Sequence, residues 1–204
     1  MTGILIAFTI VILVPLFVSS WRTSLLGLSV QGILLTSLAL GHRHVSAVDL
    51  ALGAADFGLL RSLVAPGLMY QSMRRRKVVV RNDVISPNLI SWTCAIGLVV
   101  ASFRVADTLV PTESDDQFLV AVSAAGFAVG LFVLAAAKGT FSQIIGLLRV
   151  ENAIALFELG HPHESPIPLR VGMTVLLLVS VAFYRWFLDA SDSPDEREPE
   201  ADAL

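Results

Sequence analysis

The chain has 204 residues, of which 55% are hydrophobic and only 15% are charged, and its mean hydropathy is +0.76. A water-soluble domain of this length has more charge and shorter apolar runs, so the composition predicts an integral membrane protein. The single cysteine, Cys94, excludes an intrachain disulfide, a thiolate zinc site and a four-cysteine iron–sulfur cluster.

The formal net charge of −3 comes from the C-terminal segment 189–204, which contains seven acidic residues and one arginine. Residues 1–188 carry 13 basic and 10 acidic groups and are therefore slightly basic. Because the segment 189–204 is too polar to bury a core, we expect it to be an acidic, disordered tail.

Apolar stretches follow one another along the chain, and each is close to the ~20 residues that cross a bilayer as a helix. They cover roughly residues 3–19, 23–41, 47–71, 87–107, 117–137, 141–160 and 168–188. All backbone polar groups must be hydrogen-bonded within lipid, and no run of alternating apolar and polar residues indicates a barrel strand. The expected fold is therefore an all-α bundle of about seven transmembrane helices.

The basic residues are distributed unevenly between the two ends of these stretches. One side has Arg22, Arg74, Arg75, Arg76, Lys77, Arg81, Lys138 and Arg185, whereas the other has Arg43, Arg170 and the acidic loop "VPTESDDQ". Cytoplasmic loops carry the excess of Lys and Arg, so we expect the N-terminus outside and the C-terminus in the cytoplasm, in the cell membrane. The run "RRRKVVVR" is interpreted as a topology signal and lipid-headgroup contact rather than as a nucleic-acid site.

The sequence contains a weak internal repeat. "GLSVQGILLTSLALGHRH" (27–44) and "GLLRVENAIALFELGHPH" (146–163) align without gaps at an offset of 119, with 6 of 18 residues identical. Repeats of this kind, related as parallel copies, occur in transport-related membrane folds. The predicted plan is a first three-helix unit (1–73), a basic cytoplasmic loop with a linking helix (74–115), a second three-helix unit (116–188) and the acidic tail (189–204).

One helix is expected to pack closely through small residues. The segment "GFAVG" (126–130) has the G-x-x-x-G spacing and follows several further alanines and a serine. Small residues allow helix backbones to approach closely in lipid, so this segment predicts a helix–helix interface.

Ionisable residues interrupt two of the apolar stretches. The stretch 47–71 contains Asp49, Asp56 and Arg61, and the stretch 141–160 contains Arg149, Glu151 and Glu158. Residues of this kind inside a membrane face the bundle interior or water and often mark an ion pathway. Alternatively, they form interhelical ion pairs that hold an assembly together. Arg149 lies roughly 200° around the helix from Glu151, so these two side chains cannot pair with each other.

The segment "KGTFSQIIGLLRVENAIALFELG" (138–160) resembles the C-terminal region of hydrogenase-4 component E. That family is related to the small K subunit of respiratory complex I and to the C subunit of Mrp-type cation/proton antiporters. The shared pattern falls here on Lys138, Gln143, Gly146, Leu147, Glu151, Asn152 and Ala153. A second similarity is Arg61, five residues before Pro66, where the family typically has a lysine.

The resemblance implies a membrane-arm subunit of a hydrogenase-4-like or complex I-like respiratory complex, which contributes to proton or cation translocation while other subunits transfer electrons. Its partners would be antiporter-like and other membrane subunits, together with the lipid bilayer. The expected ion pathway comprises Glu151, Arg61, Asp56, Asp49, Glu158, Lys138 and Arg149. Glu151 would carry the proton, and Arg61 would favour its charged form.

The chain departs from the family pattern at three positions. Arg170 and Leu176 stand where the family usually has acidic residues, and Arg149 stands where an apolar residue is usual. Two alternatives therefore stay open, a non-transporting scaffold subunit of the same type of complex and a subunit of an Mrp-like antiporter.

No cofactor or metal site is expected. The sequence has no haem pattern and no nucleotide-binding loop, and the pairs His42/His44 and His161/His163 are interpreted as polar residues of interfacial loops. A non-catalytic subunit is therefore the expected role.

Overall fold

The structure is a computed structural model of the full chain, and it describes residues 1–18, 20–41, 47–75, 88–110, 115–137, 139–160 and 167–190. All regular elements in these ranges are helical. They are α1 (Thr2–Phe17), α2 (Trp21–Gly41), α3 (Ala47–Gly53), η1 (Ala54–Val64), α4 (Ala65–Arg75), α5 (Leu89–Leu109), α6 (Asp115–Ala136), α7 (Thr140–Gly160) and α8 (Ile167–Ala190). Since α3, η1 and α4 follow one another without a break, the described ranges form seven helical rods, and the expected all-α fold is confirmed.

Four rods are long and apolar enough to cross a membrane: Trp21–Gly41, Leu50–Arg75, Leu89–Leu109 and Asp115–Ala136. α1 and α8 contain shorter apolar stretches, Thr2–Val14 and Val171–Phe187. α7 has the length, 21 residues, but it contains three charged residues and is not among the four. The sequence predicted seven spans, and length and composition support four of them within the described residues. Large apolar side chains such as Leu26, Ile90 and Trp186 are exposed on the outside of the bundle, as expected for a surface that faces lipid.

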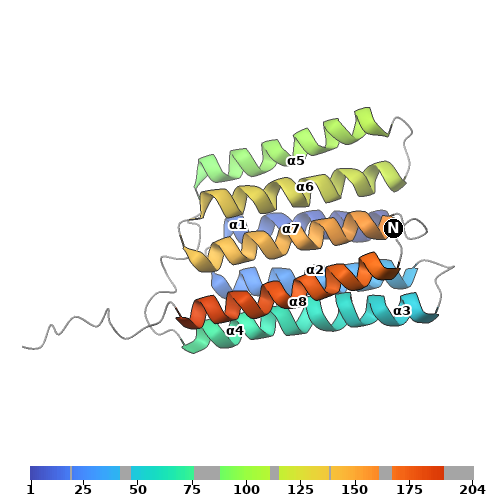
Figure 1. Ribbon diagram of the computed structural model, residues 1–204. Helices are drawn as coiled ribbons and strands as arrows, with labels where there is room; N and C mark the ends of the chain where they lie inside the picture. Colours follow the sequence, from blue (N-terminus) through green and yellow to red (C-terminus); the bar gives the residue numbers. More distant parts are fainter. Residues whose placement is uncertain are drawn as a thin grey trace, which may run out of the picture.

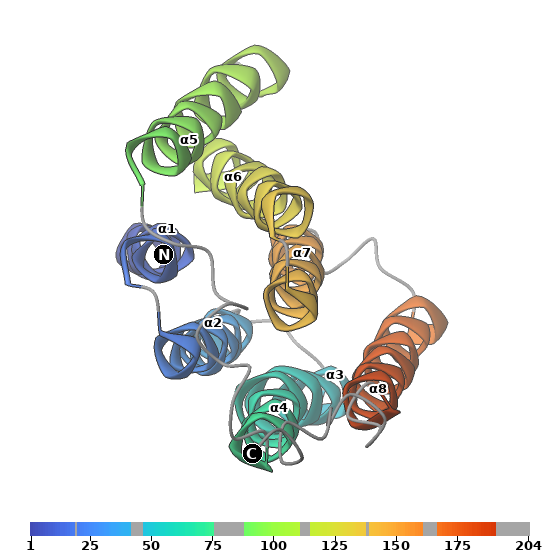
Figure 2. The same ribbon diagram turned by 90° about the vertical axis from the view of Figure 1, so that its left-hand side faces the viewer.

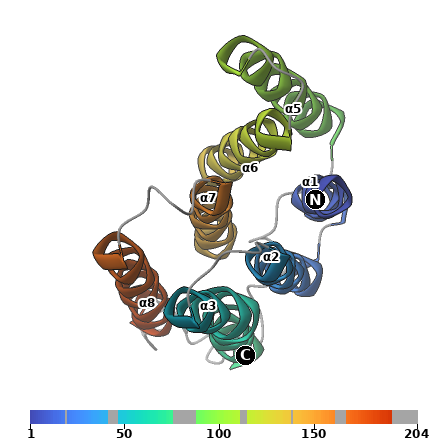
Figure 3. The ribbon, with the colours of Figure 1, turned by 90° about the vertical axis from the view of Figure 1, so that its right-hand side faces the viewer.

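The rods form two rows when viewed along their axes (Figure 2). One row consists of α1, α2 and the α3–η1–α4 rod, and the other consists of α6, α7 and α8, with α5 packed on the outer side of α6 (Figures 2 and 3). Contacts between the rows join α1 to α6, α2 to α7 and α4 to α8. In the side view the rods run roughly alongside one another (Figure 1).

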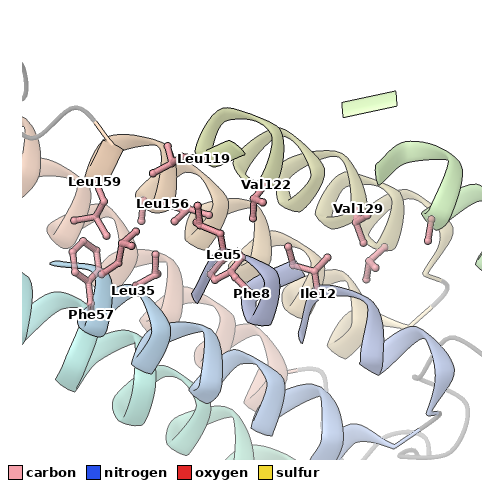
Figure 4. Close-up of a cluster of buried hydrophobic side chains, with 14 of the residues drawn as sticks. Leu5, Phe8, Ile12, Leu35, Phe57, Leu119, Val122, Val129, Leu156 and Leu159 are labelled. Carbon is pink, nitrogen blue, oxygen red and sulfur yellow. The ribbon is translucent and has the colours of Figure 1, made fainter. Parts of the chain in front are cut away.

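The apolar core consists of two clusters, which follow one another along α2, the α3–η1–α4 rod and α7. The first cluster contains Leu5, Phe8, Leu35, Phe57 and Leu156 among others, and Figure 4 shows its side chains between α1, α2, α6 and α7. The second cluster lies toward the other end of α2 and α7 and includes Leu25, Leu28, Met69, Phe141, Leu148 and Leu177. On each of α2, the α3–η1–α4 rod and α7, a short stretch of helix separates the two clusters.

Glycines bring two pairs of rods into close contact. A Cβ added to Gly130 would lie 2.8 Å from Cγ2 of Val150, and one added to Gly126 would lie 3.1 Å from the Cβ of Ala153. The expected small-residue interface of 126–130 is therefore confirmed, and its partner is α7. Likewise, a Cβ on Gly32 would lie 2.7 Å from the backbone nitrogen of Ser62, so α2 and η1 approach as closely.

Candidate functional site: a buried polar network between the two core clusters

The polar network starts from an ion pair within one rod. Nε of Arg61 lies 3.3 Å from Oδ1 and 3.4 Å from Oδ2 of Asp56. These residues are five apart, and η1 is a π-helix, in which backbone hydrogen bonds join residues i and i+5. The wider turn places residue i+5 above residue i, and Ser62 uses the same spacing to donate to the carbonyl of Phe57 at 2.6 Å.

Arg61 also connects its rod to two other helices. Its Nη1 donates to Oδ1 of Asn152 on α7 at 3.1 Å, and Nδ2 of Asn152 donates to Oε1 of Gln31 on α2 at 3.2 Å. Arg61 and Asn152 are each 3% exposed, and Gln31 is 1% exposed. A buried polar group is costly unless it is hydrogen-bonded, so these bonds hold η1, α7 and α2 in one register.

The position of this network follows from the sequence pattern of the three helices. On α7, Asn152 falls between Leu148 of the second core cluster and Ala155 of the first. Gln31 falls between Leu28 and Leu35 on α2 in the same way. Each helix therefore places one polar side chain at the level where the apolar clusters meet.

Glu151 lies beside this network but is not part of the ion pair. Its side chain is half-buried, and the hydroxyl of Ser180 on α8 lies close enough to the carboxylate to donate a hydrogen bond to it. Oε2 is buried and has no hydrogen-bond partner among the described residues. Arg61 and Asp56 both act on the carboxylate through their charges. Among the described residues, Asp56 forms the ion pair with Arg61. The sequence had suggested Glu151 as the residue on which Arg61 acts.

Ser180 connects Glu151 to a second group on α8. Its hydroxyl is also within hydrogen-bonding reach of Tyr184, one helical turn toward the end of α8. Glu151, Ser180 and Tyr184 thus form a short series of groups that can exchange hydrogen bonds. Ser and Tyr hydroxyls both donate and accept, as proton transfer between neighbours requires.

A small cavity adjoins the network. It has a volume of about 10 Å³ and is lined by Arg61 and Asn152 on its polar side and by Leu28, Leu148 and Leu177 on its apolar side. This volume is about the size of one water molecule, and two polar side chains are the minimum that a buried water needs. The arrangement can accommodate one water next to the ion pair.

The other expected pathway residues are more scattered. Arg149 is buried on a different side of α7, where its Nη1 lies 3.4 Å from the carbonyl oxygen of Ile12 on α1. Glu158 is half-buried two turns beyond Glu151. Asp49 belongs to α3, but its side chain lies outside the described part of the structure, as do Lys138 and the two histidine pairs. The structure thus brings together Asp56, Arg61 and Glu151 of the seven expected residues.

Three members of the site were not expected from the sequence: Gln31, Ser180 and Tyr184. Gln31 had a detectable signal, because it is the only carboxamide in the apolar helix Trp21–Gly41. Ser180 and Tyr184 had none, since single hydroxyls are common in membrane helices and their role depends on how α8 is rotated against α7.

Among the described residues, no group of three or more His, Cys, Asp or Glu side chains could hold a metal ion. Comparisons of the chain with protein-family models, with curated proteins and with solved structures found no match.

Proposed function

We propose that this chain is a membrane-arm subunit of a hydrogenase-4-like or complex I-like respiratory complex. In this proposal it contributes to proton or cation translocation, and other subunits transfer the electrons. The main observation that supports this proposal is the contrast between two neighbouring carboxylates. Asp56 is paired with Arg61, whereas Glu151 has a buried oxygen without a hydrogen-bond partner among the described residues.

This contrast favours a proton-carrying role for Glu151. A carboxylate in an apolar interior is expensive to keep charged, and a proton removes that cost. The nearby charge of Arg61 opposes protonation, so a change in its distance or pairing would shift the balance between the two forms of Glu151. Ser180 and Tyr184 supply a route from the carboxylate along α8.

The proposed two-unit plan agrees with the way the rods pair. The repeat equates α1 with α6, α2 with α7 and the α3–η1–α4 rod with α8. These equivalent rods are the ones that contact each other between the two rows. The alternation of chain direction along seven spans would make the two units parallel, as a transport-related repeat requires.

The proposed orientation also has a structural counterpart. α4 and α8 end at the same end of the bundle where α2 begins, so Arg22, Arg74, Arg75 and Arg185 gather there (Figure 1). Asp107, Asp115 and Asp116 lie toward the opposite end. In our proposal the basic end faces the cytoplasm.

The alternative role is a scaffold without transport, and the network of Asp56, Arg61, Asn152 and Gln31 favours it. These four side chains satisfy one another and join three helices. If Glu151 were one more link of this kind, Glu151→Gln would lower the yield of assembled complex on native gels. The relay role predicts normal assembly of Glu151→Gln, with Arg61→Gln reducing assembly instead.

The assembly itself is tested by purification. The chain, carrying an affinity tag, is extracted from its own host membrane in mild detergent, and the co-purifying proteins are identified. We expect large antiporter-like membrane subunits and redox subunits in constant ratio. Recovery of the chain by itself, folded and in one size, would contradict the proposal.

A further inference from the structure

α5 lies at the edge of the bundle, and one of its sides is uncovered. Its main contacts are with α6 and α1, and its buried residues are Ser91, Ala95, Ser102 and Ala106. At 100° for each residue, the opposite side of the helix consists of Ile90, Thr93, Gly97, Ala101 and Arg104, which are all exposed. In Figures 2 and 3 no other helix of the described structure lies beyond α5. We call these five residues the outer face of α5.

Arg104 is the charged residue of this outer face, and it has no counter-charge in the described part of the chain. Its side chain is exposed, and it makes no hydrogen bond or ion pair with another described residue. The only acidic residue of α5 is Asp107, whose Oδ1 accepts a hydrogen bond from Nε2 of Gln117 on α6 at 2.9 Å. The guanidinium of Arg104 is therefore available to a group outside this chain.

The position of Arg104 in α5 places it below the membrane surface. The 21 residues of α5 are about 31 Å long, which matches the ~30 Å hydrocarbon core of a bilayer. Arg104 precedes the end of the helix at Leu109 by about 7.5 Å along the axis. Because Cα–Cβ bonds tilt toward the N-terminus of a helix, its side chain starts toward the middle of the membrane. To reach the nearer lipid phosphates, it would have to turn back along the helix.

We propose that the outer face of α5 docks against a transmembrane helix of another protein, and that this helix carries an aspartate or a glutamate at the level of Arg104. Charged side chains within a membrane pair with other protein groups, and the complementary group for a guanidinium is a carboxylate. Toward the middle of the membrane, Ala101 and Gly97 leave room for a close approach, and a Cβ added to Gly97 would meet nothing within 4 Å. The small residues permit the contact, and the arginine selects the partner.

A second copy of this chain does not supply the required carboxylate. Two copies in one membrane have the same orientation, so a symmetric contact through the outer face would place both Arg104 side chains at the same depth. Like charges at that level repel each other. The inference rests on the proposed function only in that this function places other membrane subunits beside the chain. It does not depend on Glu151 or on proton translocation.

Photo-crosslinking in the host membrane tests the docking face directly. p-Benzoylphenylalanine replaces Gly97 in the full-length chain, and the cross-linked peptides are identified by mass spectrometry after irradiation. We expect one transmembrane segment of another protein, with an Asp or Glu about two helical turns from the cross-linked residue, because Gly97 and Arg104 are two turns apart. The same probe at Leu26, on the exposed surface of α2, should not reach that segment.

The yield of this cross-link also measures the contribution of the charge. Arg104→Gln should lower the yield about tenfold, the effect of losing one strong interhelical polar contact, while Arg104→Lys keeps most of it. Arg22→Gln, at an exposed position of α2, should leave the yield unchanged. In an Arg104→Glu background, replacing the mapped acidic residue of the partner by arginine should restore the cross-link.

A cross-link from Gly97 to a second copy of this chain, or to lipid alone, would contradict the docking proposal. An equal yield for Arg104→Gln and the parent protein would contradict it as well. If membrane subunits co-purify with the chain but cross-link only at other surfaces, the docking face is wrong and the proposed function stands.

Discussion

Asp56 and Arg61 form a buried ion pair within a single rod, with Nε of Arg61 3.3 Å from Oδ1 of Asp56. The pair neutralises two charges in the middle of the bundle without involving another helix. Arg61 therefore has a second hydrogen-bonding group, Nη1, available for Asn152 on α7. The consequence for Glu151 is that its carboxylate has no ion-pair partner among the described residues.

Breaking this pair from one side should be strongly destabilising. Arg61→Gln leaves Asp56 buried without a counter-charge, and we expect a loss of about 3 kcal/mol in stability. Asp56→Asn/Arg61→Gln removes both charges and should recover most of that loss. Thermal unfolding in detergent, followed by circular dichroism, measures both, with Arg104→Gln as the control at an exposed site. Asp56→Asn is also measured by itself, and a double variant whose loss equals the sum of the losses of Asp56→Asn and Arg61→Gln would contradict the pairing.

The contact between Gln31 and Asn152 should contribute less. Gln31→Leu keeps the size of the side chain but removes the acceptor for Nδ2 of Asn152. Interhelical hydrogen bonds in membranes contribute about 1 kcal/mol, so the unfolding midpoint should fall slightly. Ser37→Ala is the control, because the Ser37 hydroxyl is exposed and donates only within its own helix. A variant with unchanged stability would show that Asn152 does not depend on Gln31.

The α6–α7 interface should be sensitive to a single methyl group. Gly130→Ala places a Cβ 2.8 Å from a side-chain carbon of Val150, which forces the two helices apart. Overpacking of this kind costs about 1–3 kcal/mol. Gly97→Ala is a matched control in α5, where nothing lies within 4 Å of the new Cβ. If both variants unfold at the same temperature, the close approach of α6 and α7 is not a source of stability.

The orientation predicts which loops an impermeant thiol reagent can reach. In a Cys94→Ala background, single cysteines are introduced by Ser46→Cys, Ser165→Cys and Ser193→Cys, all at positions outside the described residues. On intact cells we expect labelling at the first two positions and protection at the third, because the proposed orientation places the basic loops and the tail in the cytoplasm. Labelling at position 193 alone would reverse the orientation.

The helices were predictable from the sequence, because length and apolarity determine where membrane helices begin and end. The stretch 47–71, for example, corresponds to the rod that ends at Arg75. The pairing of Asp56 with Arg61 was not predictable. In an α-helix residues five apart point in different directions, and only the wider turns of η1 bring them together. The contacts of Glu151 depend on the rotation of α8, which the sequence pattern does not specify.

The same distinction applies to Arg149. Its position two residues before Glu151 predicted that they point apart, and the structure places Arg149 against α1 and Glu151 against α8. The sequence did not indicate that a backbone carbonyl, that of Ile12, would be the contact of Arg149. Every residue has a backbone carbonyl, so the types of the side chains do not indicate which carbonyl Arg149 contacts.

The central claim is that Glu151 carries protons, and proton uptake by the whole complex in proteoliposomes, driven by its own redox reaction, tests it most directly. We expect Glu151→Gln to assemble and transfer electrons normally but to lose uptake, while Glu151→Asp keeps part of it and Arg22→Gln keeps all of it. Full uptake by a correctly assembled Glu151→Gln complex would contradict the relay and leave the scaffold role.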